Sequence, residues 1–280
     1  MRDALKLEQV SKQYNGFKLE DVNITLPSGC IMGFIGENGA GKTTTIKLIL
    51  DLIKRDGGRI QVLGQESQNM PRALKDSIGV VMDTCCFSEE LTAKHVGKIM
   101  RGFYASWDQE KYEELLRKYR IDSMKKVKEY SRGMKMKLSM AVALSHDTRI
   151  LILDEATSGL DPVAREELLE TFQDFIQDEE HSIFISSHII SDLEKICDYI
   201  TFIHKGKILF SEEKDALLEG YGILHCSRRE LEELGKSAVA GVRESAFGVE
   251  ALVKRKKIPG GMHVDPANLE DIMLYYSREE

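Results

Sequence analysis

Apolar and polar side chains alternate over residues 5–35, for example in the runs LKLEQV at 5–10 and LEDVNI at 19–24. This alternation places apolar side chains on one face of an extended chain, so it predicts strands. The turn-forming sequences NG at 15–16 and PSG at 27–29 separate these strands. Other runs are apolar at nearly every position, which is typical of strands buried on both faces: 30–35, 150–153 and 183–185.

Residues 89–145 interrupt this order of strands and helices. They are rich in Lys, Glu, Leu and Met and contain no strand-like stretch, so we expect them to be mainly helical. Because a strand pattern stands before them, at 78–82, and after them, at 150–153, we interpret the block as an inserted helical subdomain.

The pattern after residue 153 predicts further helices and strands. A helix over 162–178 has Asp161 as its N-cap and Pro162 at its first position. The pattern restarts after about residue 215. The other expected elements are a strand at 59–63, a helix at 191–197, a hairpin of 199–204 with 207–210, a helix at 227–234, strand-like runs at 249–254 and a last helix at 268–276.

Size, charge and cysteine content narrow the class of protein. The 280 residues suffice for one large domain and a small appendage, and 42% of them are hydrophobic. The net charge of −7 argues against a general nucleic-acid binder, and the short basic run at 254–257 reads as a solvated strand or turn. Five cysteines without metal-ligand spacing fit reduced thiols in the cytosol. We expect no signal peptide and no membrane span, so a membrane role would require a partner.

The segment GENGAGKT at 36–43 carries the clearest chemistry. It has two glycines four residues apart followed by Lys and Thr, between an apolar run and a predicted helix, which is the context of a phosphate-binding loop. Glycines let backbone N–H groups turn toward one anion at a helix N-terminus. Lys42 should reach the β- and γ-phosphates, and the Thr43 hydroxyl should hold Mg²⁺. The predicted nucleotide contacts here are Gly36, Asn38, Gly39, Ala40, Gly41, Lys42, Thr43 and Thr44.

Two carboxylates end the apolar run at 150–153. In a phosphate-loop enzyme the first, Asp154, can hold Mg²⁺ directly or through water. The second, Glu155, would polarise a water molecule in line with the γ-phosphate. Ligands bind at the carboxyl ends of strands in α/β folds, which favours these roles over two ordinary acids that cap a strand.

With these motifs in place, residues 5 to about 215 resemble the ATP-binding subunit of ABC transporters. The resemblance implies that Tyr14 stacks on adenine and that His188 is the switch histidine of the hydrolytic site, beside the catalytic residues Lys42 and Glu155. It also implies that the run YSRGM at 130–134 is the signature loop, with Ser131 and Gly133 as nucleotide contacts. The run SGLD at 158–161, with Asp161 as a further contact, matches the loop at the dimer interface.

The chain departs from the family pattern at two positions. The signature loop usually reads LSGGQ, so Arg132 adds a charge whose role is open. Similar variants occur in the drug, antimicrobial-peptide and lantibiotic exporters of the family. Asp83 stands where the family has a Gln that touches Mg²⁺ and the attacking water and senses the membrane partner. The resemblance therefore implies that Asp83 is a metal ligand together with Thr43 and Asp154. The alternative is that Asp83 points to solvent and the loop senses only the membrane subunit.

The resemblance implies an α/β fold of the P-loop NTPase kind, with an N-terminal antiparallel β subdomain, an ABC-type helical subdomain at about 84–147 and a small α+β C-terminal extension. We expect an ATP-binding domain at 1–215 and a C-terminal domain at 216–280. The tail is similar to that of ABC-2-type exporters, although a simple packing helix explains it equally well.

The function implied is Mg²⁺-dependent ATP hydrolysis by a head-to-tail dimer, of this chain or with a related subunit. It would drive export through a separate transmembrane permease subunit, with the chain peripheral on the cytoplasmic face of the cell membrane and no nucleic acid as partner. The alternatives are a soluble ABC-type ATPase acting on ribosomes or DNA, a GTPase or small-molecule kinase, and a regulatory subunit that binds ATP without hydrolysing it. No Asn-Lys-x-Asp motif supports a GTPase.

Overall fold

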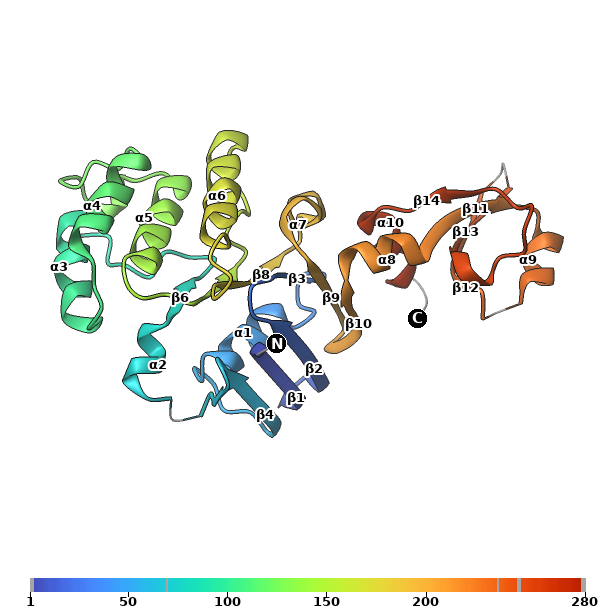
Figure 1. Ribbon diagram of the computed structural model, residues 1–280, viewed down its shortest axis with the longest axis horizontal. Helices are drawn as coiled ribbons and strands as arrows, with labels where there is room; N and C mark the ends of the chain where they lie inside the picture. Colours follow the sequence, from blue (N-terminus) through green and yellow to red (C-terminus); the bar gives the residue numbers. More distant parts are fainter. Residues whose placement is uncertain (1–2, 69, 236, 246–247, 278–280) are drawn as a thin grey trace.

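A sheet of six strands forms the centre of the molecule, in the order β10-β9-β3-β8-β7-β6 (Figure 1). Its strands run parallel except β10, which is antiparallel to β9. Their bounds are β3 (Ile31–Ile35), β6 (Ile78–Val81), β7 (Ile150–Asp154), β8 (Ser182–Ser187), β9 (Tyr199–His204) and β10 (Lys207–Glu213). The computed structural model describes residues 3–68, 70–235, 237–245 and 248–277.

The central strands are apolar throughout because both faces of the sheet are covered. In β7, Ile150 and Ile152 enter one core cluster, whereas Leu151 and Leu153 enter another. The strands predicted at 30–35, 78–82, 150–153 and 183–185 are therefore confirmed, and parallel pairing explains why they do not alternate.

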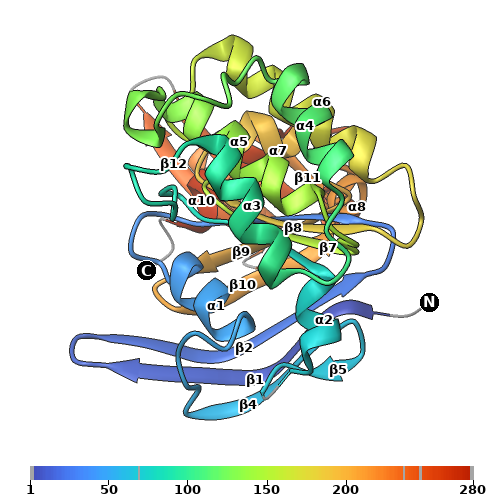
Figure 2. The same ribbon diagram turned by 90° about the vertical axis from the view of Figure 1, so that its left-hand side faces the viewer.

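An antiparallel sheet, β2-β1-β4-β5, covers the core cluster that contains Ile150. Figure 2 shows the phosphate-loop helix α1 (Lys42–Ile49) between this sheet and the central one. Ile46 and Ile49 of α1 are fully buried in the same cluster. The strands are β1 (Asp3–Tyr14), β2 (Phe17–Pro27), β4 (Gly57–Val62) and β5 (Gln65–Glu66).

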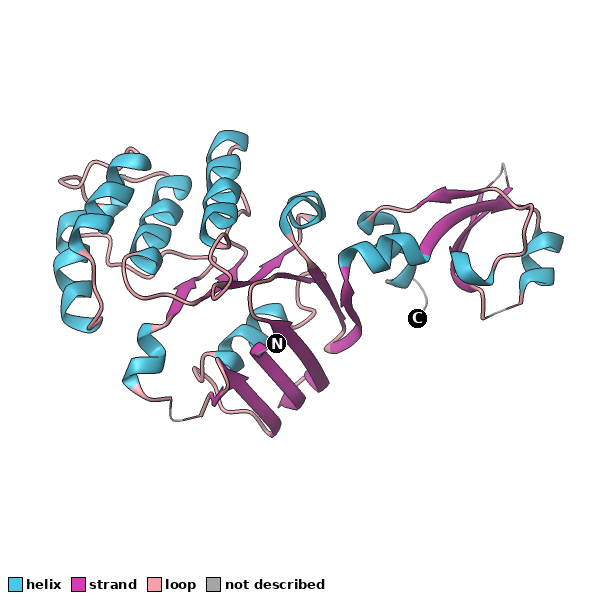
Figure 3. Cartoon of the chain, viewed as in Figure 1, coloured by secondary structure: helices cyan, strands magenta, loops and turns pink. Residues whose placement is uncertain are grey.

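Helices between residues 93 and 144 form a block at one end of the molecule (Figure 3). Its elements are α3 (Ala93–Phe103), α4 (Gln109–Lys118), the short 3-10 helix η1 (Val127–Glu129) and α5 (Arg132–Leu144). The buried Tyr112 joins two of them, because its hydroxyl donates to the Ala93 carbonyl at 2.8 Å. The mainly helical content predicted for 89–145 is confirmed, while the subdomain bounds at about 84–147 stay a prediction.

Four other helices cover the central sheet or continue from it. They are α2 (Arg72–Asp76), α6 (Pro162–Phe175), α7 (Ile190–Ile196) and α8 (Lys214–Gly220). The α6 start is as predicted, since the Asp161 carboxylate accepts from the N–H groups of Val163 and Ala164. Nothing in the sequence pattern had indicated α2 or α8. In the described part of the chain, no helix has the length and apolarity that crossing a bilayer requires.

The chain after residue 220 forms a third antiparallel sheet, β12-β13-β11-β14, with two helices. Tyr276 of its last helix lies edge-on to Phe210 of β10, with ring centroids 5.4 Å apart. The basic run at 254–257 is only partly the solvated strand or turn that was expected. Lys254 ends a strand, Arg255–Lys257 form a short 3-10 helix, and the half-buried Arg255 donates to the carbonyls of Tyr221 and Asp265. The division into domains at 215/216 stays a prediction. The elements are β11 (Tyr221–Cys226), α9 (Arg228–Leu234), β12 (Val239–Ser245), β13 (Gly248–Lys254), η2 (Arg255–Lys257), β14 (Val264–Pro266) and α10 (Leu269–Tyr276).

Candidate nucleotide-binding site

The phosphate loop joins the end of β3 to the start of α1. Gly36 lies so close to β9 that a Cβ there would stand 2.4 Å from the Ile203 carbonyl oxygen. Gly39 and Gly41 have φ angles of +84° and +117°, a region that favours glycine. The first N–H groups of α1 have no acceptor within the helix, so the helix start can receive an anion.

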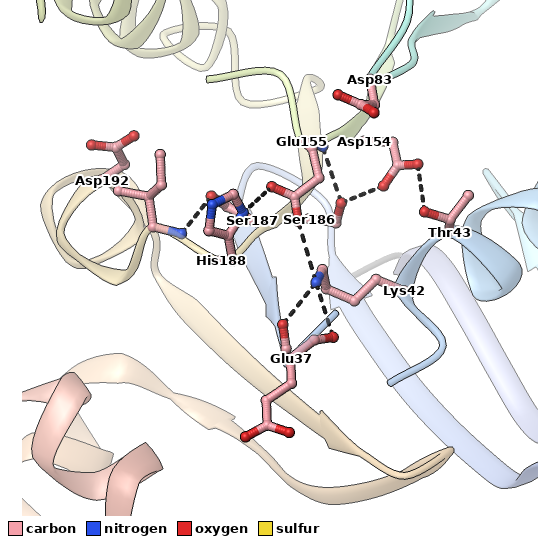
Figure 4. A network of polar contacts seen from close by, with 12 residues as sticks. Glu37, Lys42, Thr43, Asp83, Asp154, Glu155, Ser186, Ser187, His188 and Asp192 are labelled. Atoms are coloured by element: carbon pink, nitrogen blue, oxygen red, sulfur yellow. Dashed lines mark hydrogen bonds and ion pairs between the residues drawn. The ribbon is translucent and has the colours of Figure 1, made fainter. Parts of the chain in front are cut away.

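Lys42 is the buried cation of the site. Its side chain is 6% exposed, and its Nζ donates to the carbonyls of Gly36 at 2.7 Å and Glu37 at 3.3 Å. The same ammonium lies 3.2 Å from Glu155 Oε1 (Figure 4). The loop thus holds the ammonium group at the start of α1, where phosphate would be received.

Asp154 is buried, and each oxygen of its carboxylate accepts a hydrogen bond from a hydroxyl group. Thr43 Oγ1 donates to its Oδ2 at 2.9 Å, and Ser186 Oγ donates to its Oδ1 at 2.6 Å. The register of β7 beside β8 places Ser186 opposite Asp154. The structure therefore brings together two of the three predicted metal ligands, Thr43 and Asp154.

Glu155 links the phosphate loop to the predicted switch histidine. His188 Nδ1 lies 2.6 Å from Glu155 Oε2, while the other carboxylate oxygen faces Lys42 (Figure 4). Glu155 has a φ of +54°, and its N–H donates to both the carbonyl and the hydroxyl of Ser186. A non-glycine residue in this backbone region is uncommon, and such strain often marks a functional position.

A cavity of about 310 Å³ opens at the phosphate loop. Its lining includes the loop residues together with Phe17, Asp83 and Glu155. Tyr14 is not part of this lining. It ends β1 as the cross-strand neighbour of Phe17, and Lys12 Nζ lies 5.5 Å from the centre of its ring.

The predicted contacts of the signature loop lie outside that cavity. Ser131 is the N-cap of α5, where its hydroxyl accepts from Met134 N–H at 3.2 Å. Gly133 lies near α6, and a Cβ on it would be 3.4 Å from Ala164 and 4.0 Å from Asp161. Hydrogen bonds from the Ala164 and Val163 N–H groups lower the pKa of the Asp161 carboxyl. These residues gather at the starts of α5 and α6.

Asp83 has a partner that the sequence analysis did not anticipate. Its Oδ1 lies 2.7 Å from a guanidinium nitrogen of Arg132, the departure in the signature loop. Among the described residues, Asp83 makes no hydrogen bond or ion pair with Thr43 or Asp154. Its predicted role as a metal ligand stays a prediction.

Sequence reasoning also missed Ser186 and Phe17. Ser186 and Ser187 are buried serines at the carboxyl end of β8, where ligands bind in α/β folds, and this pair was a usable signal. Phe17 directly follows the predicted turn NG at 15–16, so its place opposite Tyr14 follows from hairpin pairing.

The donor set fits Mg-ATP. Within the described residues, no group of three or more His, Cys, Asp or Glu side chains could hold a metal by itself. Mg²⁺ is commonly bound by one or two protein oxygens plus substrate phosphates and water. Thr43 and Asp154 supply such oxygens beside an anion-receiving helix start and a buried ammonium, so the residues present suit a metal–nucleotide complex.

Comparisons with known proteins agree with this site. A family model described as ABC transporter matches residues 19–158. The bacitracin transport ATP-binding protein BcrA of Bacillus licheniformis is 35% identical over 212 residues, which are 75% of this chain and 69% of that protein. The lantibiotic transport ATP-binding protein SrtF of Streptococcus pyogenes is 35% identical over 214 residues, 75% of this chain and 91% of that one.

Solved structures show the same architecture. An ATP-binding subunit of an ABC transporter superposes with a TM-score of 0.68 at 27% identity, covering 82% of this chain and 93% of that one. A dimeric ATP-binding cassette bound to ADP and phosphate is similar in fold, with a TM-score of 0.67 at 20% identity, covering 75% of this chain and 98% of that one. The predicted α/β P-loop fold is confirmed. The chain belongs to the ABC transporter family, in which it is an ATP-binding subunit and an ATPase.

Proposed function

We propose that this subunit binds Mg-ATP at the phosphate loop and hydrolyses it to drive export through a separate transmembrane subunit. The observation that carries the proposal is the chain of contacts from Lys42 through Glu155 to His188, beside the Thr43–Asp154 pair. Mg²⁺, when bound with ATP, supplies charge neutralisation at the phosphates.

The proposed role of each residue follows from its contacts. Lys42 and the N–H groups at the start of α1 bind phosphate oxygens and stabilise charge that develops there. Glu155 accepts a proton from the attacking water, and His188 orients that carboxylate through the 2.6 Å contact. ATP would offer Lys42 a phosphate in place of Glu155 Oε1, which would free this oxygen for water.

Two subunits would close head-to-tail on two ATP molecules. Ser131 and Gly133 are exposed or half-buried and lie outside the phosphate-loop cavity of their own chain, so they are open to nucleotide held by another subunit. The dimeric cassette that is similar in fold supports this arrangement. The second subunit is another copy of this chain or a related ATP-binding subunit.

An apolar groove of about 780 Å³ supports the proposal that this subunit binds a membrane partner. It lies between the end of α1, the segment after β6 and the helical block, and it includes Leu52 and Phe103, which are 63% and 64% exposed. Exposed apolar side chains of this size along a groove are suited to an amphipathic segment of another protein. We propose a permease segment as the occupant, which places the subunit at the cytoplasmic face of the membrane.

The names of two relatives support a proposal for the class of transported substrate. The two named above are described as bacitracin and lantibiotic transport ATP-binding proteins. We propose that the permease partner exports a peptide of this kind. A transport role is favoured over action on ribosomes or DNA.

Replacing the buried ammonium tests the nucleotide site. We expect Lys42→Ala to weaken ATP binding at least about tenfold, because each charge-assisted contact contributes about 1.5–3 kcal/mol. The matched control is Lys47→Ala, which removes an exposed cation from the same helix. Equilibrium titration with a fluorescent ATP analogue measures both variants. Parental affinity in Lys42→Ala would show that this site does not bind the phosphates.

A charge in the groove tests the membrane partner. Phe103→Glu should abolish recovery of the chain with its permease in the membrane fraction, since a carboxylate would be buried against an apolar segment. Met124→Glu is the control, because Met124 is exposed to a similar extent, at 67%, but does not line the groove. ATP binding should be parental in both variants. Recovery of the parent chain with ribosomes or DNA instead of membranes would contradict the transport role.

A further inference from the structure

The ion pair between Asp83 and Arg132 joins two parts of the molecule. Asp83 follows β6 of the central sheet, whereas Arg132 is the first residue of α5 in the helical block. The guanidinium nitrogen and Asp83 Oδ1 are 2.7 Å apart, and the two side chains are 52% and 50% exposed. Partly exposed ion pairs of this kind contribute little net stability, so another charged group can replace either partner.

Arg132 stands where a helix disfavours a cation. The N-terminus of an α-helix carries partial positive charge, and the first turn of α5 contains no acidic residue. Asp83 supplies the missing negative charge from another segment. The guanidinium also covers Gly159, because a Cβ on Gly159 would lie 2.9 Å from Arg132 Nη1. One side chain therefore contacts both the Asp83 segment and the loop before α6.

Asp83 lines two cavities. One is the phosphate-loop cavity, which it shares with Lys42, Thr43 and Glu155. The other, of about 400 Å³, lies against the start of α5 and includes Arg132 and Lys135. Figure 4 shows Asp83 on the side of Asp154 and Thr43, with no interaction joining it to either. The Asp83 carboxylate thus pairs with a cation of the protein, while Asp83 also lines the cavity proposed for Mg-ATP.

We propose that Arg132 and the nucleotide-bound Mg²⁺ compete for the Asp83 carboxylate, so that Arg132 sets how much Mg²⁺ the site requires. The inference rests on the proposed function, because it needs Mg-ATP at Thr43 and Asp154. When Asp83 turns to the metal, Arg132 loses its partner and no longer holds the Asp83 segment to the start of α5. Occupation of the site is thereby communicated to the signature loop within one chain.

A double-mutant cycle on Mg²⁺ dependence tests the competition. Binding of a fluorescent ATP analogue is titrated with Mg²⁺ in the parent, Arg132→Gln, Asp83→Asn and the double variant. We expect Arg132→Gln to lower the half-saturating Mg²⁺ concentration about twofold to fivefold, the effect of releasing one partly exposed ion pair. In the Asp83→Asn background the same change should have no effect. Arg132→Lys, which keeps the charge, should stay near the parental requirement.

Two controls exclude other effects of removing a cation. Lys135→Gln removes a cation from the same helix, but Lys135 pairs with Glu89 at 3.0 Å and not with Asp83, so the Mg²⁺ requirement should not change. Binding without Mg²⁺ should be parental in Arg132→Gln, since the proposal gives Arg132 no phosphate contact. A change there, or a shift equally large in Lys135→Gln or in the Asp83→Asn background, would overturn the competition.

The test also separates this inference from the proposed function. If the parent chain bound no ATP with or without Mg²⁺, the nucleotide site and the competition would both be wrong. If it bound ATP with a Mg²⁺ requirement that Arg132→Gln did not alter, the nucleotide site would stand and only the competition would be wrong.

Discussion

The phosphate loop and the signature loop are both glycine-containing segments at the start of a helix. They differ in the burial of their cations and in the packing around their glycines. The phosphate-loop cation Lys42 is 6% exposed and held by carbonyls and a carboxylate. The signature-loop cation Arg132 is 52% exposed and held by one ion pair. A Cβ on Gly36 would meet the backbone of β9 at 2.4 Å, whereas one on Gly133 would make ordinary contact at 3.4 Å.

We interpret this difference as a division between binding and switching. The phosphate loop is fixed by the central sheet, so its N–H groups are arranged before a nucleotide arrives, and preorganisation of this kind strengthens binding. The signature loop is held by weak, exposed contacts that can be exchanged. Under the proposed function, one loop is therefore complete within a single chain, while the other is available for a partner.

Among the variants that test this comparison, we expect the largest change in activity from a substitution at Glu155. Glu155→Gln should lower the rate of hydrolysis about 10²–10⁴-fold, because the amide cannot accept the proton of the attacking water. ATP binding should persist, and the closed complex should accumulate. Sedimentation with Mg-ATP should then show twice the monomer mass of 31.7 kDa.

The control for this variant is Glu166→Gln on α6, whose carboxylate is 57% exposed and pairs with Lys195. It should keep the parental rate. Hydrolysis within tenfold of the parent in Glu155→Gln would contradict the role of Glu155 as base. A monomer under every nucleotide condition would instead indicate that the partner is a different ATP-binding subunit.

Much of the buried half of the site could be predicted from the sequence. Its parts are short and local: an apolar strand, a glycine loop with Lys42, and a strand ending at Asp154 and Glu155. Parallel strands in one sheet end at the same edge, so these motifs had to lie together once the fold was known. Their contacts in the structure are consistent with the roles assigned to them.

The exposed part of the site, around Asp83 and Arg132, could not be predicted from the sequence in the same way. Asp83 and Arg132 are 49 positions apart, and neither lies in a pattern that pairs them. The resemblance suggested a metal ligand at Asp83, but only the placing of α5 against the end of β6 shows the competing cation. Short elements were not predicted from the sequence for a related reason. The strand β14 (Val264–Pro266) forms by pairing with β11, and it has too few residues for a periodic pattern.

A smaller effect is expected from adding one methyl group to each loop, which tests the comparison directly. Gly36→Ala should lower the free energy of unfolding by about 1–3 kcal/mol, because the methyl group meets the Ile203 carbonyl of β9 and neither backbone can easily move. Gly133→Ala should leave stability parental or slightly raised, since alanine is favoured over glycine in a helix by up to about 1 kcal/mol. Urea unfolding of the nucleotide-free variants measures both. The same Gly133→Ala change, placed in the Glu155→Gln chain, should reduce ATP-driven association, because a methyl group would lie between the loop and a nucleotide held by the other subunit. If Gly133→Ala were as destabilising as Gly36→Ala, the signature loop would be as tightly packed as the phosphate loop, and the division between a fixed half and an exchangeable half would be wrong.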